Sequence, residues 1–235
     1  MKSNNVRSHY NNDVVARAGN AYEFDRWHKD PISQAGYEMT KKGIQRSLQG
    51  ISSKNCFELG PGAGTWTKVL CTEFPSIHID AFDISSHMLD MAKGNIKNCD
   101  VNFIEGDFNS YDGKEGVYDL FFSSRVFEYL PDQKEAVATI AKILSPGGVG
   151  IVSTKFPRGK TSSNLHEGRV HPETFRKFLK AAGLETVSVY PLTVTVPFFK
   201  SSKLNRLAFV LLAQLPLSFI HSLFCESYII RFKKS

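Results

Sequence analysis

Residues 55–66 constrain the fold of this 235-residue chain more than any other stretch, because three closely spaced glycines separate two apolar patterns there. A buried-strand pattern ends at Leu59, a turn follows at Gly60, Gly62 and Gly64, and a helix with one apolar face is predicted from 65 to 74. The glycines allow a tight turn and let a ligand approach the main chain closely. The stretch therefore predicts a nucleotide-binding strand, loop and helix.

The glycine spacing differs from that of a dinucleotide-binding loop. A G-x-G-x-x-G pattern would place its third glycine at Thr65, whereas here it comes one residue earlier. With Glu58 included, E-x-G-x-G-x-G resembles motif I of the class I S-adenosylmethionine-dependent methyltransferases. The resemblance implies that Glu58, Gly60, Pro61, Gly62 and Gly64 hold the methionine part of the cofactor. A tight turn without a ligand remains the alternative for this stretch alone.

Later motifs follow in the order of the same family. Asp83 ends a predicted strand, 77–84, where a carboxylate can accept hydrogen bonds from both ribose hydroxyls. The resemblance implies that Ile84 and Met88 flank the adenine, although Met88 also fits an ordinary core position. Three further residues complete the implied cofactor site, namely Asp107 and Phe108 at the adenine and Ser123 at the amino-acid end. An acid such as Asp107 at a strand exit is otherwise a common turn former.

The resemblance implies an α/β fold: a seven-stranded, mostly parallel, Rossmann-like sheet with helices on both faces, a reversed last strand and a helical insertion before that strand. Strands are predicted at 101–108, 118–123, 149–155, 185–196 and 225–233, in addition to those already named. We expect three parts. Residues 1–50 form a helical cap, residues 51–196 and 225–235 form the cofactor-binding domain, and residues 197–224 form an apolar helical insertion.

The amino-terminal part is expected to cap the cofactor. Residues 1–20 are polar and predicted to be mobile, and residues 32–48 form a helix ahead of the first strand. The segment between them is rich in aromatic residues. Four candidates to line the cap are Tyr22, Trp27, His28 and Tyr37, and the alternative is that these rings only pack the cap onto the domain.

The insertion contains no charged residue from Leu207 to Phe224, a run near the lower limit for a membrane span. Polar residues and a proline interrupt this run, and the next strand has to return to the sheet. We therefore expect a bent helix or helical hairpin that forms a lid. Two alternatives remain open, a peripheral contact of residues 197–235 with a membrane surface and a helix buried against the domain.

Charge and cysteine content limit the class of protein. The net charge is +6, and residues 200–235 hold six basic residues against Glu226. The first 199 residues are nearly neutral, which argues against a nucleic-acid partner. Four scattered cysteines, with no spacing typical of a metal site and no visible signal peptide, predict reduced thiols and a cytoplasmic location, with peripheral membrane attachment as an alternative.

The family resemblance implies transfer of a methyl group from S-adenosyl-L-methionine to an O, N or C atom, with S-adenosyl-L-homocysteine as product. The predicted acceptor is a small, apolar or lipid-linked molecule, because the segments able to cover the site are rich in aromatic and apolar residues. His166 is the candidate general base, since histidine titrates near neutral pH. The alternatives are a non-catalytic cofactor-binding scaffold or membrane module, and an NAD(P)-dependent oxidoreductase. The sequence does not define the acceptor or the oligomeric state.

Overall fold

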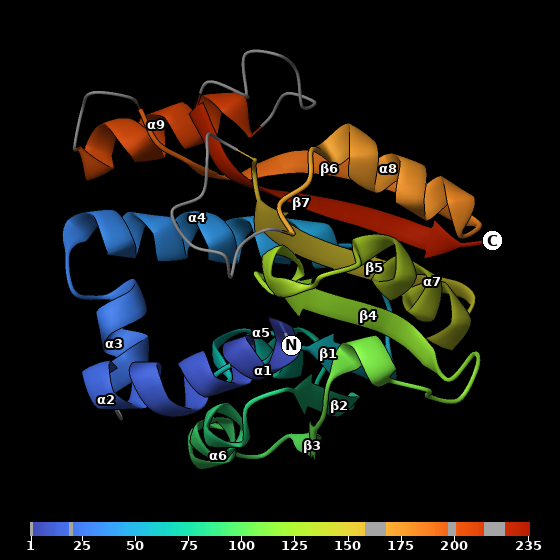
Figure 1. The fold of residues 1–235 in the computed structure, drawn as a ribbon. Helices are drawn as coiled ribbons and strands as arrows, with labels where there is room; N and C mark the ends of the chain where they lie inside the picture. The colour runs from blue at the N-terminus through green and yellow to red at the C-terminus, as the bar shows by residue number, and fades with distance from the viewer. Residues whose placement is uncertain (1, 19–20, 158–167, 197–200, 214–223) are drawn as a thin grey trace.

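The computed structural model describes residues 2–18, 21–157, 168–196, 201–213 and 224–235. Within them, one seven-stranded sheet has the order β3-β2-β1-β4-β5-β7-β6 (Figure 1). Neighbouring strands from β3 to β5 pair in parallel, and β7 runs antiparallel to both β5 and β6. The strands are β1 (Asn55–Leu59), β2 (His78–Asp83), β3 (Asp100–Glu105), β4 (Tyr118–Ser124), β5 (Leu144–Lys155), β6 (Leu184–Val194) and β7 (Cys225–Lys234). This confirms the predicted fold class, including the reversed last strand.

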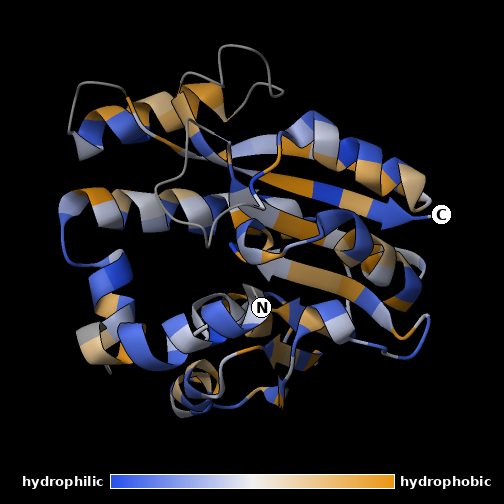
Figure 2. Cartoon of the chain, in the orientation of Figure 1, coloured by the Kyte–Doolittle hydropathy of each residue, from blue (hydrophilic) through white to orange (hydrophobic). Residues whose placement is uncertain are grey.

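Helices cover both faces of the sheet, because alternate strand residues point to opposite sides. Phe57 and Phe121 share one core with residues of α7 and α8, and Cys56 and Phe122 share a second core with α4 and α5. The ribbons of β4 and β5 are largely hydrophobic in colour, as expected for strands buried on both faces (Figure 2). The longer helices are α4 (Pro31–Leu48), α5 (Thr65–Glu73), α6 (Ser86–Asn95), α7 (Gln133–Ile143), α8 (Pro172–Ala181) and α9 (Ser202–Leu212).

The helix boundaries follow local capping signals. The Asp30 side chain accepts hydrogen bonds from the first amides of α4, and Ser85 accepts one from Met88 at the start of α6. His171 precedes α8, which begins with a proline, a residue favoured in the first helical turn. One boundary differs from the prediction. Residues 145–148 belong to β5 rather than to a turn before it, because Leu144 already pairs with Tyr118 ahead of a register shift.

The amino-terminal residues correct one expectation. Residues 2–18 are helical rather than mobile, as α1 (Lys2–Ser8), a π-helical turn (His9–Asp13) and α2 (Val14–Ala18). Val6 and Val14 are buried, and the Arg7 Nε donates to the carbonyl oxygen of Ile84 at 3.1 Å. Composition suggested mobility, but scattered apolar residues are enough to anchor this segment once α6 provides a surface. Helix α3 (Tyr22–Trp27) then leads to α4.

Helix α9 is the described part of the insertion between β6 and β7. Its Phe209 packs with Ala35 and Met39 of α4, and Arg206 forms an ion pair with Glu38 at 2.8 Å. The opposite side of α9 is apolar and exposed, with Leu207, Val210 and Leu211 each more than half accessible. No helix among the described residues is long and apolar enough to cross a membrane.

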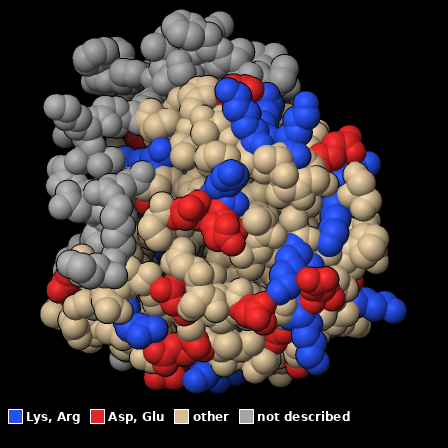
Figure 3. Space-filling model, turned by 45° about the vertical axis from the view of Figure 1, so that its right-hand side comes forward, with Lys and Arg blue, Asp and Glu red and all other residues tan. Residues whose placement is uncertain are grey.

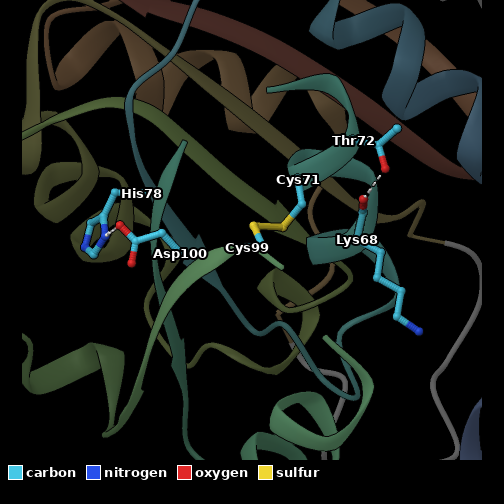
Figure 4. The surroundings of a disulfide bond; sticks show 6 residues. All are labelled: Lys68, Cys71, Thr72, His78, Cys99 and Asp100. Carbon is cyan, nitrogen blue, oxygen red and sulfur yellow. Dashed lines mark hydrogen bonds and ion pairs between the residues drawn. A yellow bond between two sulfur atoms is a disulfide. The ribbon is translucent and has the colours of Figure 1, made fainter. Parts of the chain in front are cut away.

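A disulfide corrects the expectation that all thiols are reduced. Cys71 of α5 is bonded to Cys99, which lies just before β3, and their Cα atoms are 6.0 Å apart (Figure 4). The two residues are 28 positions apart in the sequence, so their spacing gave no sign of pairing. They meet because α5 returns the chain beside β2 and the edge strand β3. Cys56 and Cys225 are buried and do not belong to this disulfide.

Candidate functional site

A cavity lies at the carboxyl ends of β1, β2 and β4. The strand order reverses between β1 and β4, and open α/β sheets bind ligands at such a switch point. Strands, loops and the amino-terminal helices all contribute to the wall. The lining residues used below are Ser3, Val6, Tyr10, Tyr22, Arg26, Gly60, Gly62, Asp83, Ile84, Met88, Phe108, Ser124, Arg125 and Tyr129.

The glycine loop forms one side of the cavity. Gly60 has φ of +73°, and a Cβ atom at this position would collide with the side chain of Val126. Its amide donates to the carbonyl oxygen of Phe82 at 2.8 Å, which holds the loop against β2. Gly62 has φ of +56°, and its amide faces the Asp83 carboxylate at 3.3 Å. The loop therefore requires glycine at both positions and exposes main chain to the cavity.

Asp83 is the acidic group of the cavity wall. It accepts hydrogen bonds from the amides of Ser85 and Gly62, at 3.0 and 3.3 Å. Burial raises the pKa of Asp83 to about 6, and these amides offset only part of that effect. No described cation forms an ion pair with it. Asp83 therefore keeps acceptor capacity for a ligand that brings hydroxyl groups.

Glu58 lies beneath the loop rather than in the cavity wall. It is 1% exposed, and its Oε2 has no hydrogen-bond partner in the part of the chain that the structure describes. Burial raises the pKa of Glu58 to about 8, the neighbouring Thr67 hydroxyl acts in the opposite direction, and the charge of Asp83 adds to the increase. An orphaned buried carboxyl group here fits a site that receives a positively charged ligand group.

Six of the eleven predicted cofactor residues line the cavity, and the other five do not. The six are Gly60, Gly62, Asp83, Ile84, Met88 and Phe108, and the five are Glu58, Pro61, Gly64, Asp107 and Ser123.

Asp107 and Ser123 have other partners. Asp107 accepts from the amide of Asn109 at 3.0 Å and caps a short helical turn, η3 (Phe108–Ser110). Although partial burial raises its pKa, hydrogen bonds from Ser3 and Asn109 bring the pKa of Asp107 below its ordinary value. The Ser123 hydroxyl donates to the carbonyl oxygen of Leu59 at 3.0 Å, and the next residue, Ser124, lines the cavity instead. A shift of one residue reverses the side of a strand that a side chain occupies.

The sequence analysis missed the amino-terminal residues of the wall. Tyr10 donates to the hydroxyl of Tyr129 at 3.1 Å, and the Ser85 hydroxyl donates to Asn11 at 2.6 Å. These contacts fasten the π-helical turn to the loops after β2 and β4. Arg26 of α3 was also missed, because only the aromatic residues of its segment were considered. The sequence did contain a signal for this site, because Arg26 stands close to Tyr22 and Trp27. Arginine, tyrosine and tryptophan side chains together are typical of polar ligand sites.

The aromatic candidates of the cap divide into two groups. Tyr22 lines the cavity, whereas Tyr37 stacks on Trp66 of α5 with centroids 5.5 Å apart, and Trp27 lies 5.5 Å from the same ring. His28 contacts Tyr37. These three residues therefore pack the cap onto the domain, as the alternative predicted. His166, the candidate base, lies outside the described residues.

Arg125 and Glu128 pair with each other in the loop after β4. The Arg125 Nε lies 2.7 Å from Oε1 of Glu128, and Glu128 is fully buried. The Thr154 hydroxyl donates to the second carboxylate oxygen at 3.0 Å. Arg125 itself also reaches the cavity wall, in a backbone conformation with φ of +66°. The pair therefore fixes the loop after β4 at the edge of the cavity.

The comparisons with known proteins agree with this geometry. Residues 57–148 match the family model described as a methyltransferase domain. Residues 57–148 therefore form a domain of the class I S-adenosylmethionine-dependent methyltransferase type. A malonyl-[acyl-carrier protein] O-methyltransferase of Priestia megaterium is 34% identical over 153 residues, which cover 62% of this chain and 55% of that relative. This methyltransferase chain thus matches little more than half of the length of that relative.

Solved structures support the same fold for this methyltransferase. The [4+2]-cyclase SpnF has a TM-score of 0.70 at 16% identity, covering 99% of this chain and 96% of SpnF. Phosphoethanolamine N-methyltransferase 2 of Haemonchus contortus, solved with S-adenosyl-L-methionine, has a TM-score of 0.66 at 15% identity, covering 96% of this chain and 60% of that one. Identities this low establish the architecture and leave the chemistry to the site.

Proposed function

We propose that this chain binds S-adenosyl-L-methionine in the cavity between the glycine loop and the amino-terminal helices, and transfers its methyl group to a small acceptor. The observation that carries the proposal is the position of Asp83 opposite Gly60 and Gly62. It supplies a carboxylate with spare acceptor capacity beside exposed main chain, at the switch point of the sheet. Glu58, with its orphaned oxygen beneath the loop, suits the cofactor's ammonium end.

In this proposal, different residues of the cavity contact different parts of the cofactor. Asp83 accepts from the ribose, Ile84, Met88 and Phe108 pack around the adenine, and Ser124 lies near the amino-acid end. Pro61 and Gly64 shape the loop without contacting the ligand. Bound S-adenosyl-L-methionine supplies an electrophilic methyl group on a sulfonium. The remaining tasks of the protein are to orient the acceptor in line and to exclude water.

The tyrosines of the wall are suited to orienting an acceptor. Burial raises the pKa values of Tyr10 and Tyr129, so both hydroxyls stay protonated at neutral pH. Protonated hydroxyls donate and accept hydrogen bonds but do not remove a proton from the acceptor. A separate base, for which His166 remains the sequence prediction, is needed only for an acceptor that has to lose a proton.

A peripheral membrane contact is a second candidate property, favoured by the exposed apolar side of α9. Leu207, Val210 and Leu211 form this surface, next to the basic Lys203. An apolar helix side with adjacent cations is typical of helices that lie on a membrane surface. Such attachment would suit an apolar or lipid-linked acceptor.

Binding measurements test the proposed function. Titration calorimetry with S-adenosyl-L-homocysteine and with NAD⁺ should show binding of the first alone. Gly60→Ala should abolish that binding, since the added methyl group meets Val126 in a left-handed conformation. Gly147→Ala is a matched control, because Gly147 also has positive φ but lies in open space away from the cavity. Tighter binding of NAD⁺ would instead support an oxidoreductase. Release of S-adenosyl-L-homocysteine with an acceptor panel separates the enzyme from a scaffold.

A further inference from the structure

A second hollow adjoins the cofactor cavity and shares part of its wall. Five residues line both spaces, namely Tyr10, Tyr22, Arg26, Arg125 and Tyr129. The second hollow extends from them to Lys155 at the end of β5 and to Asp25 and Lys29 of the cap. A group bound in this hollow would therefore lie next to the cofactor cavity, separated from it only by tyrosine and arginine side chains.

Arg26 is the central cation of the shared wall. Its Nη1 donates to the Tyr22 hydroxyl at 2.6 Å, and its guanidinium lies 4.8 Å from the centre of the Trp27 ring. Among the described residues, no carboxylate forms an ion pair with Arg26. A guanidinium has five N–H donors, and a partly buried one without an acidic partner retains donors for a ligand.

Three more cations line the hollow with Arg26, namely Lys29, Arg125 and Lys155. Arg125 is paired with the buried Glu128. Lys155 is half-buried, and its pKa is lowered by burial and by the nearby Arg125 and Arg169. Asp25 is the acidic residue among the described lining of this hollow. The hollow therefore carries more positive than negative charge.

Charged residues of both signs occupy the side of the molecule shown in Figure 3. Lys and Arg are interspersed there with Asp and Glu, and neutral residues occupy much of the face. An excess of cations confined to a hollow is costly unless an anion compensates it. An anionic ligand bound in the hollow would compensate its cations.

We propose that the methyl acceptor carries an anionic group, a carboxylate or a phosphate, which binds to Arg26 and Lys155 in the second hollow. Planar guanidinium groups recognise both kinds of anion through paired hydrogen bonds. The hydroxyls of Tyr10 and Tyr22 can then orient the part of the acceptor that faces the cofactor cavity. This inference rests on the proposed methyl transfer, because the shared wall gives the hollow its role.

Binding of small anions tests the inference directly. Malonate and inorganic phosphate are titrated into the protein by calorimetry at constant ionic strength, with and without S-adenosyl-L-homocysteine. At least one should bind the parent, and Arg26→Gln should weaken that binding tenfold or more. Arg26→Lys should recover part of it. Arg206→Gln is the matched control, since Arg206 lies on the exposed α9 and should leave binding unchanged.

Lys155→Met provides a second variant in case Arg26→Gln does not fold, and it should also weaken binding tenfold. Equal binding by the parent and these variants, or no binding of either anion, would overturn the inference. Preference for malonate or for phosphate would identify the kind of anionic group. S-adenosyl-L-homocysteine binding is read separately, so its absence would reject the proposed function while the anion titration still reports on the hollow.

Discussion

Replacing Asp83 by asparagine should weaken cofactor binding and stabilise the free protein. In the folded chain the carboxylate is held by the amides of Gly62 and Ser85 without a cation, and burial raises its pKa to about 6. Asparagine retains one oxygen for those amides and removes the charge. The two effects should therefore have opposite signs, which a general loss of structure cannot produce.

The structure sets the size of both effects. A hydrogen bond to a charged group contributes roughly 1.5–3 kcal/mol, so loss of the Asp83 charge should weaken S-adenosyl-L-homocysteine binding about 10- to 100-fold. The pKa of Asp83 is higher in the folded chain than in the unfolded chain, so its protonation favours folding. The free energy of unfolding should therefore fall as pH rises from about 4 to about 6. Because Asp83 is only partly buried, Asp83→Asn should be more stable at pH 7 by about 1–2 kcal/mol.

Calorimetry between pH 5 and pH 8 and urea unfolding at pH 7 measure these two quantities. Parent affinity should be highest above about pH 7 and decline through about pH 6, as Asp83 takes up a proton. The affinity of Asp83→Asn should be low and should vary less with pH. Parent affinity independent of pH, or equal affinity in the variant, would refute the role of the Asp83 carboxylate.

Three further predictions concern other parts of the molecule. The parent should lose stability as pH rises through about 8, because the folded-state pKa of Glu58 is raised and its protonated form favours folding. Glu58→Gln should reduce this loss, which urea titrations at pH 6 and pH 9 measure. Cys71→Ser should lower the free energy of unfolding by about 3–4 kcal/mol under oxidising conditions and leave it unchanged in reductant, as denaturant curves would show. Leu207→Ser with Leu211→Ser should reduce sedimentation with anionic vesicles, whereas Val187→Ser on β6 should not, and a parent that ignores such vesicles would exclude the membrane contact.

The fold could be predicted because its signals are local and come in a fixed order. The glycine turn, the acid ending β2 and the capped helices each occupy a short segment, and their order matches one family. The disulfide could not be predicted, since Cys71 and Cys99 are brought together only by the packing of α5 beside the sheet edge. The helices of residues 2–18 were missed because their stability comes from contact with α6 and the loops rather than from composition.

The cofactor cavity was predicted more completely than the acceptor side. Residues such as Gly60 and Asp83 are tied to motifs, so their positions follow from the sequence once the family is recognised. The shared wall instead combines Tyr10, Arg26 and Tyr129 from three distant segments, and no short pattern connects them. The sequence analysis chose Ser123, whereas its neighbour Ser124 lines the cavity. Adjacent residues of a strand point to opposite sides of the sheet.

The position of β7 between β5 and β6 also determines the order in which the sheet can assemble. Strand β6 precedes β7 in the chain, yet it pairs within the sheet only with β7. Until residues 225–234 insert, the outer edge of β5 and both edges of β6 present unpaired backbone groups beside apolar side chains such as Leu192 and Val194. Such edges are sites of intermolecular strand pairing. Pairing of β7 with β5 and β6 covers these edges, so a change that hinders this pairing should expose the protein to aggregation.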